Sequence, residues 1–387
     1  MTAPLRALRI AGLPAIEMLR SRWRALATVR SANMPFAGPE YAISAFKSYH
    51  HDGEPIVWIV EQGTQLEAVL PLVRRPLRRL GIQINEIGFP CNPQFILNDP
   101  LLPPNRFRAQ EVAECILRGA ATECCDTILL DHLTCENETA EVFCAAAANC
   151  GLLRDALAES RNLYFVAVDG DFTHYLASRS SELRSKIKRV MRRLKQNGGY
   201  SLECYHGRSA IEKISPIFNL IEERSWQAAQ TSLKEAALNR NFVRQLSIET
   251  PESEIGELWL LHIGGRPAAA LRMVGAFDRI AVHTMHFDPS FAKFSPGTIL
   301  MHAMLQRAWE GRVKEVDLHG NSAFFARWAT GHRRHVTLRL YQRKPFCRFV
   351  RQGKRFLQLP QGGSATKPKV RQLLFGAYQV SAETVRR

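Results

Sequence analysis

The stretch Phe287-Asp-Pro-Ser-Phe-Ala-Lys-Phe-Ser-Pro-Gly-Thr-Ile-Leu300 decides the fold, and it runs directly into Met301-His-Ala-Met-Leu-Gln-Arg-Ala-Trp309. The pattern indicates a strand end, a turn and then a helix. Ser295 is suited to cap that helix, and Pro296 fits its first turn because an N–H there would lack an intrahelical partner. Gly297 leaves the backbone bare, so a ligand can approach the N–H groups of the turn. We therefore predict a phosphate-binding helix start made of Ser295, Pro296, Gly297 and Thr298.

Composition narrows the class of protein. The chain has 387 residues, 46% of them apolar, which is enough for two packed domains. The formal net charge of +16 favours an anionic partner such as nucleic acid, a phosphorylated cofactor, anionic lipid or acidic polysaccharide. The alternative is a soluble protein whose surface is merely basic. Because we find no apolar run of about 18 residues and no signal-peptide pattern, we expect a cytoplasmic protein.

The nine cysteines are odd in number and irregularly spaced, without a Cys-x-x-Cys pair. This pattern is typical of reduced cysteines in the core of a cytoplasmic protein, and we expect no metal site. Several of them lie in alanine-rich, helix-like surroundings: Cys115, Cys124, Cys125, Cys144 and Cys150.

Hydrophobic periodicity predicts the same order of elements in both halves of the chain. The first half is predicted to contain helices at 16–29, 36–49, 106–124 and 138–149 and strands at 56–60, 66–73, 84–88 and 127–130. The second half is predicted to contain helices at 180–197, 210–227, 234–248 and 296–310 and strands at 201–205, 256–263, 268–276, 280–287, 313–318 and 335–341. This order indicates mixed α/β layers and a degenerate internal duplication.

The predicted boundaries follow from this order. We expect an N-terminal domain over 1–168, a second domain over 169–345, and a basic C-terminal tail over 346–387 that includes a flexible Gly-Gly-Ser stretch.

Four motifs occur in a characteristic order. They are the basic helix at 183–194, Glu223-Arg-Ser-Trp226, the Asp-Pro to Ser-Pro-Gly turn at 287–297, and Asp317-Leu-His-Gly320. With the hairpin arm Leu70-Pro-Leu-Val-Arg-Arg75, they make the chain resemble the GNAT-like acetyltransferase family that includes cellulose-biosynthesis-associated proteins and is related to the Fem peptidyltransferases. The resemblance implies an α/β (α+β) fold of two tandem GNAT-like domains, each with a mixed, mostly antiparallel sheet flanked by helices.

The resemblance also implies a reaction, in which an acyl group is transferred from acetyl-CoA or another acyl-CoA to an amine. The amine is expected to belong to an amino sugar or to a cell-envelope polysaccharide precursor. Such a site needs a pyrophosphate-binding turn, for which 295–298 is the candidate, and a group that accepts the proton of the amine. The candidate catalytic residues are Asp317, His319 and His286. A turn-capping aspartate explains Asp317 equally well, and a structural role is the default for the histidines. His283 and His286 are expected to share one face of their strand. The candidate substrate-binding residues are Arg224, Trp226, His283 and Asn321.

One segment departs from the family pattern. Phe324-Phe325-Ala326-Arg327 stands where the family has a Tyr-Lys pair before Trp328, so the lysine is absent or displaced to Arg327. Two alternatives therefore stay open. One is a Fem-like transferase that uses aminoacyl-tRNA, although nucleic acid is not the expected partner because the basic helix has no interleaved aromatic residues. The other is a non-catalytic accessory protein of exopolysaccharide synthesis that contacts a membrane or a polysaccharide synthase.

Overall fold

The computed structural model describes residues 3–30, 35–49, 53–79, 82–90, 98, 100–123, 125–135, 138–228, 231–251, 256–276, 278–311, 313–348 and 351. Cys124 and residues 352–387, which include most of the predicted tail, lie outside the described residues. The seven cysteines within them are free thiols; Cys125 and Cys347 are buried and the others half-buried.

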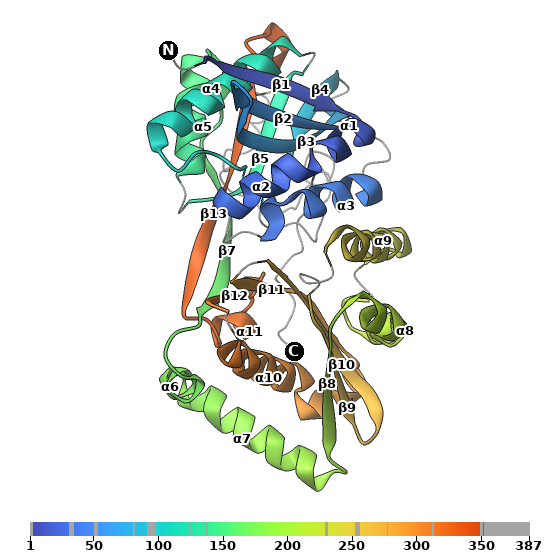
Figure 1. The fold of residues 1–387 in the computed structure, drawn as a ribbon. Helices are drawn as coiled ribbons and strands as arrows, with labels where there is room; N and C mark the ends of the chain where they lie inside the picture. Colours follow the sequence, from blue (N-terminus) through green and yellow to red (C-terminus); the bar gives the residue numbers. More distant parts are fainter. Residues whose placement is uncertain are drawn as a thin grey trace, which may run out of the picture.

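One continuous sheet of thirteen strands runs through the described part of the chain (Figure 1). The strand order is β1-β2-β3-β4-β5-β13-β7-β12-β11-β10-β9-β8, and the short β6 pairs with β13. The strands of the first half are β1 (Leu5–Ala11), β2 (Glu54–Gln62), β3 (Gln65–Arg79), β4 (Ile82–Gly88), β5 (Thr127–Thr134), β6 (Leu153–Arg154) and β7 (Ala158–Ala167). Those of the second half are β8 (Tyr200–Tyr205), β9 (Leu258–Ile263), β10 (Arg266–Ala276), β11 (Arg279–Phe287), β12 (Glu315–Asp317) and β13 (Gly331–Tyr341).

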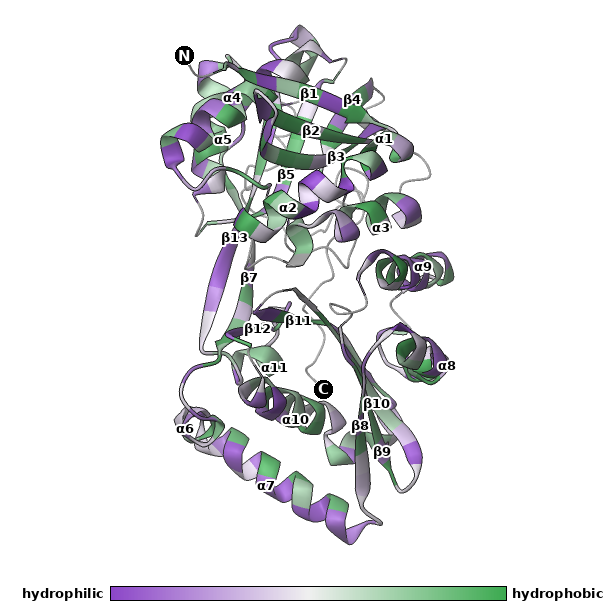
Figure 2. Ribbon diagram, in the orientation of Figure 1, coloured by the Kyte–Doolittle hydropathy of each residue, from purple (hydrophilic) through white to green (hydrophobic). Residues whose placement is uncertain are grey.

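Helices cover both faces of this sheet. They are α1 (Leu13–Met18), α2 (Arg20–Arg30), α3 (Pro39–Tyr49), α4 (Arg106–Thr122), α5 (Thr139–Asn149), α6 (Phe172–Ser178), α7 (Ser181–Gln196), α8 (Arg208–Arg224), α9 (Leu233–Glu249), α10 (Pro296–Glu310) and α11 (Ala323–Ala326), with the 3₁₀ turns η1 (Pro35–Ala37) and η4 (Pro289–Phe294). In the second half, α7 and α10 pack on one face of the sheet, while α8 and α9 pack on the other (Figure 1). The middle of β2, residues 56–60, and residues 68–73 of β3 are apolar, as expected for strand segments that are covered on both faces (Figure 2).

The two halves repeat the same order of elements, which confirms the expected fold class. In each half a strand, helices and a three-stranded meander are followed by a helix and a further strand. The described strand pairs are antiparallel apart from β4–β5 and β11–β12, which are parallel. A helix, α4 or α10, makes the crossover between the two members of each parallel pair, because parallel neighbours cannot be joined by a tight turn.

The last strands of the two halves are exchanged. β7 ends the first half of the chain but pairs with β12 of the second half, whereas β13 pairs with β5 of the first half. The two strands also pair with each other and span both halves in Figure 1. The domain boundary at residue 168 stays a prediction, and the exchange shows that a cut there would separate paired strands.

Most predicted elements lie close to the observed ones, and the helix predicted at 296–310 matches α10 (Pro296–Glu310). The helix predicted at 16–29 is instead two helices, α1 and α2, separated at Leu19. β1 and β7 are not among the predicted strands. Within the described residues, no helix combines the length and hydropathy needed to cross a bilayer.

Candidate functional site

The site lies where two parallel strands diverge. β11 and β12 pair only over Arg279–Ala281 and Glu315–Asp317. β11 then continues to Phe287, whereas β12 ends at Asp317. We call the space between the unpaired part of β11, residues 282–287, and the segment after β12 the β11–β12 wedge. A cavity of about 610 Å³ lies in this wedge, lined by β11, the start of α10, the segment after β12, and α11.

Eight of the predicted site residues line this cavity: Trp226, His283, His286, Ser295, Pro296, Gly297, Thr298 and His319. Three others do not line it. Arg224 forms an ion pair with Asp288 (3.7 Å) on the surface, Asn321 is exposed, and Asp317 is buried behind the cavity wall. The cavity also includes Lys186, Gln227, Phe324 and Phe325, which are not among the predicted site residues.

The start of α10 differs in detail from the predicted cap. Ser295 adopts the left-handed conformation (φ 47°, ψ 57°), and its side chain makes no capping hydrogen bond, so the expectation of a serine cap is wrong. The side chain of Asp288 instead caps the preceding η4 turn by accepting the N–H of Ser290 at 2.9 Å. A left-handed residue at this point turns the chain sharply from η4 into α10 and leaves the serine hydroxyl free of the capping role.

Gly297 lies in the wall of the cavity beneath two side chains. A methyl group at its Cα would lie 3.4 Å from Cε of Met285 and 3.6 Å from Cζ of Phe324, which are ordinary contact distances. Alanine would therefore fit at this position. The backbone of Gly297 is less accessible to a ligand than predicted, because Met285 and Phe324 lie against it.

His283 and His286 lie on the same side of the sheet, but for a reason other than strand alternation. Residues three apart in a regular strand point to opposite faces. The β10–β11 register pairs Arg272 with Thr284 and Met273 with Val282, so His283 is an extra residue in a β-bulge. The bulge resets the alternation. The His283 ring consequently stacks on Phe242 of α9 (6.0 Å), and the His286 ring meets the edge of Phe218 of α8 (5.6 Å).

His286 is held in one tautomer by its neighbours. Nδ1 lies 3.1 Å from Oε1 of Gln227, and Nε2 of Gln227 donates to the carbonyl of Met285 at 3.3 Å. Because the oxygen of Gln227 faces the ring, Nδ1 carries the proton and Nε2 keeps its lone pair. Oε1 of Glu222 is 3.7 Å from that Nε2. Burial, together with the charge of Arg272, lowers the pKa of His286 to about 4, so the ring is neutral at pH 7.

His319 lies at a sharp turn that Asp317 stabilises. His319 has φ 53°, and its N–H donates to Oδ1 of Asp317 at 2.7 Å. Oδ2 of Asp317 is 3.8 Å from Arg333, which also forms an ion pair with Glu315. The His319 ring stacks on Phe36 of η1 (5.2 Å) and lies 6.5 Å from His283. Asp317 is thus a positioning residue that holds His319 at the cavity.

The protonation of Asp317 gives a testable pH dependence. Burial raises its pKa to about 6, although the N–H of His319 and the charge of Arg333 oppose this rise. In the unfolded chain the pKa is about 3.9, so between about pH 4 and 6 the folded state holds a proton that the unfolded state has lost. The free energy of unfolding therefore falls as pH rises through this window.

We expect that the Asp317→Asn variant, which has no carboxyl group to titrate at this position, does not lose stability as the pH rises through this window. A rise of about two pH units corresponds to about 3 kcal/mol, so the stability of the variant relative to wild type should increase by about that amount between pH 4 and pH 7. Urea unfolding at the two pH values measures this difference. A difference that stays constant with pH would show that the carboxyl group titrates normally.

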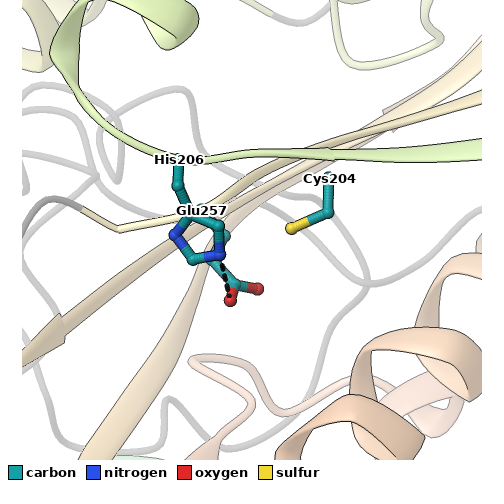
Figure 3. A group of neighbouring side chains, drawn as sticks. All are labelled: Cys204, His206 and Glu257. Atoms are coloured by element: carbon teal, nitrogen blue, oxygen red, sulfur yellow. Dashed lines mark ion pairs between the residues drawn. The ribbon is translucent and has the colours of Figure 1, made fainter.

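One group of side chains outside the cavity has metal-ligand chemistry. Atoms of Cys204, His206 and Glu257 lie within 4.8 Å of one another (Figure 3). The carboxylate is already engaged, with His206 at 3.0 Å and the indole N–H of Trp259 at 2.7 Å. Burial and Glu257 raise the pKa of Cys204 to about 12, so its thiol is protonated at pH 7. These contacts already occupy the carboxylate, and Zn²⁺ would first have to displace the thiol proton.

Comparison with known proteins finds a similar domain and similar folds. Residues 181–327 match the sequence profile of the acetyltransferase (GNAT) domain. A search of curated proteins gives no match.

Three of the similar solved structures cover most of this chain. The crystal structure of FemX has a TM-score of 0.59 at 11% identity and covers 86% of this chain and 98% of its own. The C-terminal domain of a putative lysylphosphatidylglycerol synthetase from Agrobacterium fabrum has a TM-score of 0.53 at 11% identity, with coverages of 88% and 96%. A tandem GNAT protein from the clavulanic acid biosynthesis pathway has a TM-score of 0.48 at 14% identity. Residues 181–327 of this chain are thus similar to the acetyltransferase (GNAT) domain, and the chain as a whole shares its fold with FemX.

Proposed function

We propose that this protein transfers an acyl group from an acyl-CoA to an amine, in the wedge between β11 and β12. The observation that carries the proposal is that one cavity brings together the start of a long helix, two histidines of β11 and His319 from the segment after β12. The GNAT match over 181–327 supports the same chemistry.

The residues around the cavity fit the phosphate groups of a CoA thioester. The start of α10 carries the partial positive charge of a helix N-terminus, which favours anions. Lys186 lines the same cavity, and burial together with the charge of Arg327, which does not itself line the cavity, lowers the pKa of Lys186. A bound anion would relieve this repulsion. Arg327 thus supplies positive charge at the segment where the family pattern has a lysine.

His286 is the candidate proton acceptor. A bound thioester supplies an activated acyl carbon, and transfer forms a carbon–nitrogen bond to the amine as the carbon–sulfur bond breaks. The attacking nitrogen must lose a proton. Nε2 of His286 has the free lone pair for this step, and Glu222 at 3.7 Å stabilises the protonated ring. The proton finally leaves with the thiol product.

The test of the proposal is ligand-dependent thermal stability. A ligand that binds only the folded state raises the melting temperature according to its concentration relative to Kd. We expect CoA and acetyl-CoA to stabilise the protein, and longer acyl-CoAs to rank by chain length if the cavity also accepts the acyl group. No stabilisation by any of these compounds at millimolar concentration would contradict the proposal and would favour a non-catalytic accessory role.

A second candidate donor, aminoacyl-tRNA, is favoured by the surface of α7. This helix buries Leu183, Ile187, Val190 and Leu194, while its opposite face is cationic (Figure 2). The exposed cations are Arg184, Lys188, Arg189, Arg192, Arg193 and Lys195. A tRNA donor would show binding that weakens steeply with salt, with a slope that falls when these cations are removed. Salt-independent binding of CoA with no tRNA binding would exclude it.

A further inference from the structure

Arg272 is a buried cation in an otherwise apolar strand. It lies in β10 among alanine, leucine, methionine and valine, and only 9% of its surface is exposed. Its guanidinium carbon lies 4.6 Å from the ring centre of Phe218, and its Nε has no hydrogen-bond partner. Among the described residues it forms no ion pair. Burial lowers its pKa to about 10, so it stays charged at pH 7.

A charge in this position costs stability unless something pairs with it. Arginine is almost never fully buried without a partner, because desolvation of the guanidinium must be offset by hydrogen bonds or an opposite charge. The ring of Phe218 offsets only part of this cost. The carboxylate of Glu222 also acts on the charge of Arg272, but among the described residues the two form no ion pair. A ligand that carries negative charge can therefore take the place of a direct partner.

Arg272 lines two hollows that adjoin the candidate site. The larger, of about 520 Å³, lies between α8 and α9 and includes Glu222 and Thr284 in its wall. The smaller, of about 70 Å³, lies beside Tyr41 of α3 and includes His283. Thr284 and His283 also line the cavity in the β11–β12 wedge. A molecule between α8 and α9 can thus contact Arg272 while it approaches the histidines.

We propose that the hollow between α8 and α9 binds the amine acceptor and that Arg272 holds an anionic group of that acceptor, a carboxylate or a phosphate. The guanidinium fork suits both groups, since it can donate two parallel hydrogen bonds to their oxygens. Glu222 in the same wall attracts the ammonium group and lies next to His286. The acceptor class is then a molecule that carries both an amine and an oxyanion. This inference rests on the proposed acyl transfer.

Thermal shifts with small anions test the assignment without an assay of activity. Sodium acetate and sodium phosphate are titrated into the full chain at constant ionic strength, with sodium chloride as the balance. We expect a saturable rise in melting temperature for wild type. A larger response to acetate identifies a carboxylate, and a larger response to phosphate identifies a phosphate. Arg272→Met should abolish the response, and Arg272→Lys should weaken it because lysine lacks the planar fork.

Arg244→Met is the matched control, because Arg244 lines the same hollow but is exposed to solvent. It should keep the response. No response in wild type, an unchanged response in Arg272→Met, or an equal loss in Arg244→Met would overturn the assignment. If Arg272→Met does not fold, the Arg272→Lys comparison decides. CoA stabilisation measured on the same proteins separates the two proposals. CoA binding without anion binding contradicts only this inference. Anion binding without CoA binding contradicts the proposed function, and with it the assignment of the anion to an acyl acceptor.

Discussion

Replacement of His286 by alanine is expected to lower the rate of acyl transfer by about 10²–10⁴-fold, which is the usual contribution of a positioned general base. The reason lies in the geometry. Gln227 holds the proton on Nδ1, so the lone pair on Nε2 is the one available to accept the amine proton. Release of free thiol from acetyl-CoA, followed with a panel of amino sugars and amino acids, measures the effect on kcat and KM.

Two further variants separate a base from a merely structural histidine. His302→Ala removes a half-buried histidine of α10 that does not line the cavity, and it should leave the rate unchanged. Gln227→Glu places a carboxylate on Nδ1 and should raise the pKa of His286 above its value of about 4. The rate falls where the ring is protonated, so the acidic limb of the pH–rate profile should move to higher pH. Full activity of His286→Ala would exclude this residue as the base.

Ser295→Asp is expected to weaken CoA binding by about 10–100-fold, because two unit charges about 4 Å apart repel strongly near a protein surface. The variant should remain folded. Aspartate tolerates the left-handed conformation of Ser295, and a negative charge at a helix start is stabilising. Ser295→Asn is the matched control, since it has nearly the same shape without the charge.

Calorimetric titration of CoA into the three proteins measures the effect. We predict that wild type and Ser295→Asn bind CoA with similar affinity and that Ser295→Asp binds it much more weakly. Equal affinity in all three would mean that no phosphate lies near the start of α10. A loss in both variants would instead indicate a requirement for the serine hydroxyl.

The sequence predicts those parts of the fold that depend on local signals. α10 begins at Pro296 because proline suits a first helical turn, and the same residues identify one wall of the cavity. β7 escapes prediction because its first half, Ala-Glu-Ser-Arg-Asn, is polar and lacks a clear alternation. The exchange of β7 and β13 is a long-range pairing, and nothing in either strand alone specifies which partner it takes.

The site itself is only partly readable from the sequence. The bulge at His283 depends on the β10–β11 register, and the contact of His286 with Gln227 joins residues 59 positions apart. Neither leaves a local pattern. Arg272 did leave a signal, since a single arginine within the apolar run Ala268–Ala276 is unusual for a covered strand.

Hydrogen–deuterium exchange with and without CoA tests most directly the claim that the β11–β12 wedge holds the donor. We expect CoA to slow exchange at residues 282–287 of β11, 295–300 of α10 and 318–325 after β12. The exchange rates of β2 and β3 in the first half should stay unchanged. Protection confined to other segments, or none at saturating CoA, would contradict it.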